Sequence, residues 1–332
     1  MRKLLQVLLI VSVCICFVLF LKGTNVKESF LLIKQLGVYS VFIIITTFLA
    51  YISGTLGWKY CIDSSVKFSL SQLFMIRHVG NTITLFNPTS AIAGEIYNAK
   101  TLINEGVKGQ DAYKSVLLSR ILMILSQLTL FIILLTWFLL FLSYRFPAEI
   151  TYSVYVCFFA LLTALPILIW FLLKEEGRKQ ISLTDKKWKK VLIRISEMRY
   201  LLADHIRERP RKTIIAFLLF TTHWILGSLE LFFILYFLKY NIDILDGLFL
   251  DTVIIVLKST VSFIPGQLGI EELINKFVLH LIGISSPYLW LSVSILRRTR
   301  QLFWSGIALI FYLHLRNRKR SKESYGSIIR ES

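Results

Sequence analysis

The chain has 332 residues, of which 55% are hydrophobic and 17% are charged, and its formal net charge is +18. In soluble domains about a quarter of the residues are charged. Several apolar runs of this chain reach the length of about 18 residues that marks a membrane span. These values exclude a disordered chain, a collagen, a disulfide scaffold and a soluble enzyme with one core, and they predict an all-α polytopic membrane protein.

The excess of basic residues lies in the connections between the apolar runs. In a soluble protein this excess would point to nucleic acid. Beside membrane spans, the expected partner is anionic lipid headgroups instead, and no nucleic-acid partner is expected. The cysteines Cys14, Cys16, Cys61 and Cys157 have no metal-ligand spacing. We therefore expect neither a metal nor a cofactor.

The first predicted element is an apolar run from Leu4 to Leu21, preceded by Arg2 and Lys3. A signal peptide has a shorter apolar core that ends in small residues. Because this run ends in the sequence Phe-Leu-Lys-Gly, we expect a retained first span, followed by an external loop.

The rest of the chain contains further runs long enough to cross a membrane. These runs are 36–58, 112–142, 150–173, 213–238 and 288–313. The regions 67–105 and 245–283 each contain two shorter apolar stretches, interrupted by proline and glycine. Each region is either a helical hairpin that enters the membrane and returns, or a pair of full but polar spans. We expect about six long transmembrane helices plus two re-entrant or broken helical hairpins.

Lysine and arginine predict the orientation, because they are enriched in short cytoplasmic loops. The loop 174–212 holds 13 of them and the tail after His314 holds six, whereas the loops on the opposite side hold four. We expect both termini in the cytoplasm and the protein in the cell (plasma or inner) membrane. From Trp188 to Leu202 the pattern predicts either an amphipathic helix on anionic membrane lipids or a solvated loop packed on one side.

The second half of the chain repeats the first at an offset of 177 residues. The matched pairs are Phe86 and Phe263, Pro88 and Pro265, Glu95 and Glu272, Leu102 and Leu279, Gly106 and Gly283, and Arg120 and Arg297. The predicted parts are an N-terminal span and loop 1–35, a first repeat 36–142, a linking span and basic loop 143–212, a second repeat 213–319, and a basic cytoplasmic tail 320–332.

The single span at 150–173 inverts the second repeat relative to the first. Inverted repeats are typical of transporters, in which two related halves meet near the bilayer midplane and alternately expose one side or the other. The alternative is an old duplication that is kept only for packing. Because charged residues occupy matched positions inside the membrane, transport is the favoured interpretation.

Two polar clusters occupy matched places in the repeats, at 87–95 and 264–272. In each, proline and small residues end one helix and let another begin, and the free N–H groups of the new helix suit a phosphate or a carboxylate. The candidate substrate-binding residues of the clusters are Pro88, Gly94, Glu95, Pro265, Gly269, Glu271 and Glu272. The alternative for the glutamates is stabilisation of the helix start alone.

Arginines inside the predicted spans are the other candidate substrate-binding residues, because a charge at such depth is costly unless it is paired or hydrated. These residues are Arg120, Arg297 and Arg298. Arginine suits bidentate contact with phosphate, so arginines at mirrored depths would pass a lipid phosphate between leaflets. The alternative is that ion pairs of Arg120 with Glu95, and of Arg297 with Glu272, only hold the hairpins together.

Two more charged residues inside the membrane are candidates for coupling transport to an ion or a proton. Glu230 lies deep in the run 213–238, and Lys258 lies in the region 245–283. The alternative for Glu230 is a hydrogen bond to a neighbouring helix.

The two proline-to-glutamate clusters, each followed by an arginine in the next span, resemble the flippase-like membrane region of lysylphosphatidylglycerol synthases. The likeness covers roughly 4–315, and the motif Pro265-Gly266, Gly269 and Glu272 carries it best. The resemblance implies a stand-alone member that moves a lipid or a lipid-linked substrate across the membrane. It does not imply lysine transfer, which belongs to a soluble domain of the full synthases.

We therefore expect a flippase-like transporter for an anionic phospholipid or a polyprenyl-phosphate-linked glycan. One alternative is a membrane glycosyltransferase on a lipid carrier, for which Asp243 and Asp246 are the best carboxylates. Another is an accessory protein of envelope or glycan assembly. No P-loop, zinc-protease motif or nucleophile elbow is found, so we do not expect an enzyme.

Overall fold

The computed structural model describes residues 31, 33–86, 92–141, 148–173, 200, 203–260, 270–281 and 286–331. Several predictions concern residues outside these ranges and stay predictions. They are the first span at 4–21, the candidate residues Pro88, Pro265 and Gly269, and the amphipathic segment from Trp188.

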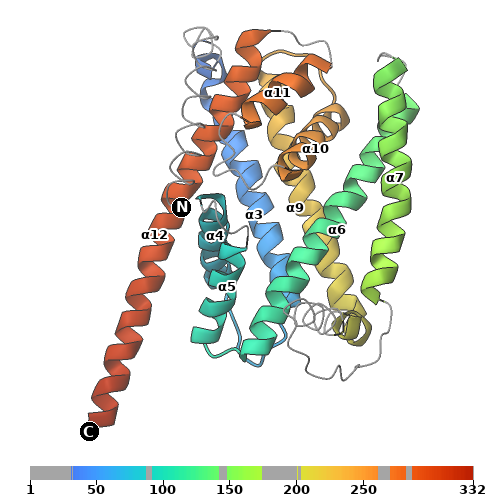
Figure 1. Ribbon diagram of the computed structural model, residues 1–332. Coiled ribbons are helices and arrows are strands. Elements are labelled where there is room, and N and C mark those ends of the chain that lie inside the picture. The colour runs from blue at the N-terminus through green and yellow to red at the C-terminus, as the bar shows by residue number, and fades with distance from the viewer. Residues whose placement is uncertain are drawn as a thin grey trace, which may run out of the picture. The chain divides into compact units, whose positions relative to one another are not determined.

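Every regular element in the described ranges is a helix (Figure 1). The elements are the 3₁₀ turn Gly37–Tyr39 and the α-helices α3 (Ser40–Cys61), α4 (Leu70–Phe86), α5 (Ala93–Asn104), α6 (Gly109–Phe141), α7 (Ala148–Leu173), α9 (Pro210–Phe237), α10 (Ile244–Thr260), α11 (Ile270–Leu281) and α12 (Pro287–Glu331). The protein is an all-helical polytopic membrane protein, as its composition predicts.

Within the described ranges, four segments are long and apolar enough to cross a membrane: Ile33–Cys61, Gly109–Phe141, Thr151–Phe171 and Pro210–Phe237. They coincide with four of the predicted long runs. The run 288–313 lies inside α12, a single helix of 45 residues, but it does not reach the same apolarity because three arginines interrupt it. The predicted count of six long spans is therefore neither confirmed nor contradicted.

The two regions that proline and glycine interrupt each form a pair of shorter helices. The first pair is α4 and α5, with 17 and 12 residues, and the second pair is α10 and α11, also with 17 and 12 residues. At about 1.5 Å per residue, a 12-residue helix is about 18 Å long, which is too short for a hydrocarbon layer of about 30 Å. These lengths favour helices that enter the membrane and return over two full spans.

The helix bounds follow the offset found in the sequence. The first residue of α11, Ile270, comes 177 residues after the first residue of α5, and the two helices have the same length. Each also has glutamate in its first turn, where the helix dipole favours a negative charge. The two hairpin regions thus agree in the order and length of their helices, whereas α3 and α9, and α6 and α12, differ in length.

Two helices end in the same hydrogen-bonded motif, although the residues at the motif's turning point differ. After α5, Gly106 has φ +98° and the N–H of Val107 bonds to the carbonyl of Leu102. After α9, Lys239 has φ +63° and the N–H of Tyr240 bonds to the carbonyl of Leu235. A left-handed residue of this kind, usually glycine, satisfies the last carbonyls of a helix, so both ends are well defined.

The chain divides into two compact units. Unit 1 consists of Met1–Tyr51, Ser71–Asn98 and Ile225–Ser332, and unit 2 consists of Ile52–Leu70 and Ala99–Trp224. In unit 1, α11 packs on both α10 and α12. In unit 2, α6 packs on α7, and the apolar window of α7 has no buried residue. This leaves most of the surface of α7 available to lipid.

Within unit 1, α3 and α9 lie side by side and run in opposite directions. The ring of Tyr39, just before α3, stacks on that of Phe237 with centroids 4.5 Å apart, and Phe42 contacts Phe233 at 5.4 Å. Residue numbers therefore rise along α3 as they fall along α9. The offset superposes these two helices, so an inverted repeat requires this arrangement of them. The inversion of the remaining elements stays a prediction.

Candidate functional site

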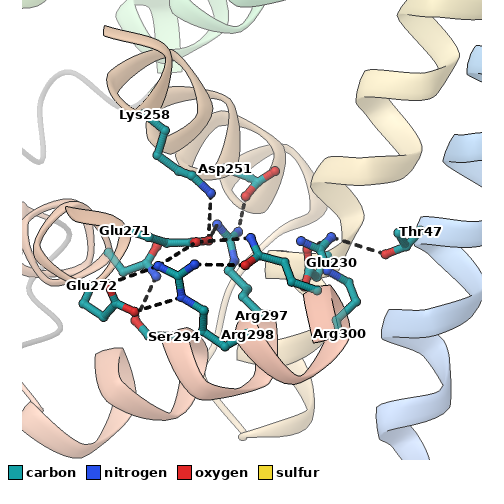
Figure 2. Close-up of polar contacts among 12 residues, drawn as sticks. Thr47, Glu230, Asp251, Lys258, Glu271, Glu272, Ser294, Arg297, Arg298 and Arg300 are labelled. Carbon is teal, nitrogen blue, oxygen red and sulfur yellow. Dashed lines mark hydrogen bonds and ion pairs between the residues drawn. The ribbon is translucent and has the colours of Figure 1, made fainter. Parts of the chain in front are cut away.

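Eight charged side chains of unit 1 gather where α9, α10, α11 and α12 meet, and we call them the charged cluster (Figure 2). The acidic members are Glu230, Asp251, Glu271 and Glu272, and the basic members are Lys258, Arg297, Arg298 and Arg300. The four negative and four positive charges balance. Buried charges are tolerated when they are paired and hydrogen-bonded in this way.

Helix geometry explains why these residues meet. Asp251 and Lys258 are seven residues apart on α10, so both lie on the same face of that helix. Arg297 and Arg300 are three residues apart on α12 and project from neighbouring positions of one face. Glu271 lies in the first turn of α11, with its side chain toward the other two helices (Figure 2).

Arg297 forms an ion pair with Asp251, and both side chains are almost completely buried. Its second contact is with Glu271, at 3.9 Å from Nη1 to Oε1. Glu272 instead accepts from Arg298, with 3.1 Å between Nε and Oε1. The predicted pair of Arg297 with Glu272 is therefore wrong. Neighbouring residues on a helix point about 100° apart, and it is Arg298 that faces Glu272.

Glu271 has the largest number of charged neighbours in the cluster. Its Oε1 lies 2.9 Å from Nζ of Lys258, and its Oε2 lies 3.6 Å from Nη2 of Arg298. The same Oε2 accepts a hydrogen bond of 3.4 Å from the side-chain amide of Gln301. One carboxylate of α11 thus holds groups from α10 and from α12.

Arg300 connects the cluster to α3. Its Nη1 lies 2.6 Å from Oε2 of Glu230 and also donates to the hydroxyl of Thr47, at 3.3 Å. Glu230, the candidate coupling residue of α9, is buried. This single arginine therefore links α3, α9 and α12.

The partly exposed members of the charged cluster are all basic. All four carboxylates and Arg297 are buried. The side chains of Lys258, Arg298 and Arg300 are 16%, 19% and 18% exposed, respectively. The accessible part of the cluster is therefore cationic, which suits an anionic ligand.

The first repeat places its candidate residues differently. Gly94 is buried where α5 meets α4, and its N–H donates to the hydroxyl of Thr84 at 3.1 Å. A Cβ at Gly94 would lie only 1.9 Å from the carbonyl oxygen of Gly80. Gly94, which the sequence suggested as a substrate residue, is thus needed first for close helix packing.

As the sequence predicts, Glu95 lies in the first turn of a helix and Arg120 lies within a candidate span. Their surroundings differ from those of the matched residues Glu272 and Arg297 in the second repeat. Glu95 is half-buried in the first turn of α5, and Arg120 has an exposed side chain on α6. Because the two residues belong to different units, their predicted ion pair stays a prediction.

Sequence reasoning singled out six members of the charged cluster and missed two. Asp251 is not among the candidates of the sequence analysis, although it stands seven residues from Lys258. Arg300 follows the two arginines that were selected, and its position one turn after Arg297 was the available signal. Helical spacing in the sequence was therefore the signal that could have identified both residues.

An open pocket of about 640 Å³ lies elsewhere in unit 1, at the C-terminal end of α9. It is lined by Tyr39, Tyr236, Phe237, Lys239, Tyr240, Asn241 and Ile242. Tyrosine and lysine are typical of the membrane–water interface, so the lining marks the end of this span. Among the residues that the structure describes, no group of three or more His, Cys, Asp or Glu side chains is placed to hold a metal ion.

Comparison with known proteins shows the family of the chain. Residues 4–315 match the family described as "Lysylphosphatidylglycerol synthase TM region", and no curated protein matches the chain. The match covers nearly the whole chain, as the resemblance in the sequence predicts, and makes the protein an integral membrane protein of a lipid-related process. The chain therefore belongs to the lysylphosphatidylglycerol synthase transmembrane-region family.

Proposed function

We propose that the protein translocates a lipid with a phosphate-bearing headgroup between the two leaflets of a membrane. The observation that carries this proposal is the sign pattern of the charged cluster, in which the carboxylates are buried and Lys258, Arg298 and Arg300 remain partly exposed. A phosphate that reaches the cluster meets cations first. The guanidinium group is well suited to bidentate contact with phosphate oxygens.

Because its charges balance, the charged cluster suits the transient binding of an anion better than tight binding. A site with uncompensated cations would hold an anion tightly and release it slowly, whereas each cation of this cluster already has a carboxylate partner. The headgroup therefore gains only the difference between its own contacts and those it replaces. The cations return to the carboxylates when the headgroup leaves, which avoids unpaired buried charge.

Two features extend the proposal to a transport cycle. The repeat of helix order, together with the antiparallel α3 and α9, supports two inverted halves that expose the headgroup to alternate sides. Arg120 of the first repeat is the proposed second contact for the phosphate. Glu230 and Lys258 are the proposed coupling residues, because each makes a close ion pair between two helices.

We also propose that the protein lies in the cell membrane with both termini in the cytoplasm, where the basic loop contacts anionic lipids. The concentration of 13 lysines and arginines in the loop 174–212 supports this orientation. Reporter fusions to the C-terminus test it: a fluorescent protein that matures only in the cytoplasm is expected to be bright. A signal from a reporter that is active only outside the cytoplasm, fused at the same site, would reverse the orientation.

The function is tested with purified protein in liposomes that contain fluorescent phosphatidylglycerol. A membrane-impermeant reductant bleaches only the outer leaflet, so translocation appears as bleaching beyond half of the signal. We expect wild-type protein to accelerate it and Arg298→Gln to slow it about tenfold or more, because one phosphate contact is worth at least ~1.4 kcal/mol.

The matched control is Lys276→Gln. Lys276 is an exposed cation of α11 that lies over the ring of Trp290, outside the charged cluster. Its loss is expected to leave the rate unchanged. Wild-type protein that moves lipid no faster than empty liposomes, or an Arg298→Gln/Arg300→Gln variant as fast as wild type, would contradict the proposal.

A further inference from the structure

The carboxylate of Glu271 occupies a position built for an oxyanion. It is buried, and its two oxygens are approached by Nζ of Lys258 at 2.9 Å and by Nη2 of Arg298 at 3.6 Å (Figure 2). The amide of Gln301 lies 3.4 Å from one of these oxygens. Nη1 of Arg297 lies 3.9 Å away. Donors of four side chains therefore converge on one group that carries a single negative charge.

A phosphodiester has the same two properties as this carboxylate. It bears one negative charge, and it shares that charge between two non-bridging oxygens. A phosphomonoester has three such oxygens and carries a charge of about −1.5 to −2 at pH 7, so it does not match. In charge and in number of oxygens, Glu271 therefore matches a diester.

We infer that Glu271 is an internal substitute for the phosphodiester of the lipid headgroup, and that the headgroup binds by displacing Glu271 from Lys258, Arg298 and Gln301. This inference rests on the proposed function and specifies its substrate as a diester, such as the headgroup of phosphatidylglycerol. It requires no covalent step, because the cations only exchange one anionic partner for another.

The exchange has a mechanical consequence for α11. Glu271 is the residue through which α11 contacts Lys258 of α10 and Gln301 of α12. When a phosphate takes these donors, Glu271 must leave its place, since two anions cannot share it without repulsion. The helix that carries Glu271 then moves with it. Headgroup binding and the movement of α11 are thus coupled through the same exchange of partners.

The test measures binding of phosphatidylglycerol to the purified protein in detergent by native mass spectrometry. Glu271→Gln removes the competing charge and is expected to bind this lipid about tenfold more tightly than wild type, within the usual range of coupling between sites. The control is Glu230→Gln, which removes the same charge from the same cluster without freeing those donors, because Glu230 pairs with Arg300. We expect Glu230→Gln to increase the affinity clearly less.

A second variant keeps the charge and changes only its position. Glu271→Asp shortens the side chain by one methylene and is expected to bind phosphatidylglycerol more tightly than wild type, because the aspartate reaches its donors less well. This variant tests the inference even if Glu271→Gln fails to fold. Equal affinity of wild type and Glu271→Asp, or a gain in Glu271→Gln no larger than that in Glu230→Gln, overturns the inference.

Two further arms identify the ligand. Phosphatidic acid, a monoester, and inorganic phosphate are expected to compete poorly with phosphatidylglycerol, and equal competition by either would overturn the diester assignment. Translocation is measured on the same preparations. Tighter binding by Glu271→Gln without any translocation by wild type would remove the proposed function and keep this inference. Normal translocation by wild type without any gain in the affinity of Glu271→Gln would overturn this inference and keep the proposed function.

Discussion

The charged cluster of the second repeat has almost no counterpart in the first. At an offset of 177 residues, the positions of Glu272 and Arg297 are filled by Glu95 and Arg120. The other six positions lack charge in the first repeat: Ser53 stands for Glu230, Phe74 for Asp251, Asn81 for Lys258, Gly94 for Glu271, Ile121 for Arg298 and Met123 for Arg300. Helix order is repeated, but the chemistry of the site is not.

The two hairpins are accordingly held together in different ways. In the first, α5 packs on α4 so closely that Gly94 has no room for a side chain. In the second, α11 is held to α10 and α12 by ion pairs through Glu271 and Glu272. Steric packing has no substitute partner, whereas an ion pair can be exchanged for a ligand. We therefore expect the second hairpin to be the one that moves.

The largest effect is expected from breaking the buried ion pair of the second repeat. Asp251→Asn leaves the buried Arg297 without its main partner and should lower the free energy of unfolding by about 3–5 kcal/mol. The measurement is the melting temperature in detergent. The control is Asp63→Asn, since the side chains of Asp63 and its partner Arg209 are 34% and 38% exposed and such pairs contribute about 0–1 kcal/mol. Similar losses in both variants would show that the cluster is not a dry, paired core.

A smaller loss is expected from crowding the first hairpin. The added methyl group of Gly94→Ala would meet the carbonyl oxygen of Gly80, so the variant should lose about 1–3 kcal/mol. Gly227→Ala is the control, because a Cβ at Gly227 meets no atom within 4 Å and alanine favours a helix interior. The two melting temperatures are compared under the same conditions. An unchanged value for Gly94→Ala would mean that the first hairpin is as adaptable as the second.

A third effect concerns acid and lies outside the charged cluster. Burial lowers the pKa of His205, just before α9, and Lys114, Arg209 and Lys212 lower it further while Asp63 raises it. The folded protein therefore resists protonation of His205. Stability should be full above the unfolded pKa of about 6.5 and should fall as the pH drops from there toward the lower pKa of the folded state.

Melting temperatures between pH 8 and pH 5 check this expectation, with His205→Gln as the comparison. The variant cannot titrate, so its melting temperature should fall less on acidification than that of wild type. If both fall equally, the acid sensitivity belongs to other groups, and the ion pairs of the cluster become the first candidates.

The smallest effect on stability is expected for Arg120→Gln. Its side chain is exposed, so the change should stay within about 0.5 kcal/mol. Translocation in liposomes should nevertheless slow, although less than in Arg298→Gln, if the phosphate passes from one repeat to the other. A wild-type rate would restrict phosphate contact to the second repeat.

The sequence predicts the framework well because its signals are local. Proline and glycine interrupt the two hairpin regions where the structure separates α4 from α5 and α10 from α11, and the repeat follows from matching residues alone. The sequence leaves open whether each of these regions is a hairpin or a pair of full spans, because composition does not give the length of a helix. The 12 residues of α5 and of α11 supply that length.

Pairing within the site depends on distant helices and could not be read in the same way. Whether Arg297 or Arg298 meets Glu272 is decided by the rotation of α12 against α11, and one position changes the direction of a side chain by about 100°. The packing role of Gly94 could not be predicted for a similar reason. A glycine beside a glutamate suggests a seat for an anion, but the approach of Gly80 shows that it fills a steric need.

The length of α12 has a consequence for any motion at Arg298. The helix continues without interruption to Glu331 (Figure 1), so about 50 Å of rigid rod follows the arginine at about 1.5 Å per residue. A tilt of only 5° at the arginine would swing the far end by roughly 4 Å. If the proposed headgroup exchange tilts α12, the far end of the helix therefore moves much further than the arginine, and a spin label near Glu331 would report that tilt.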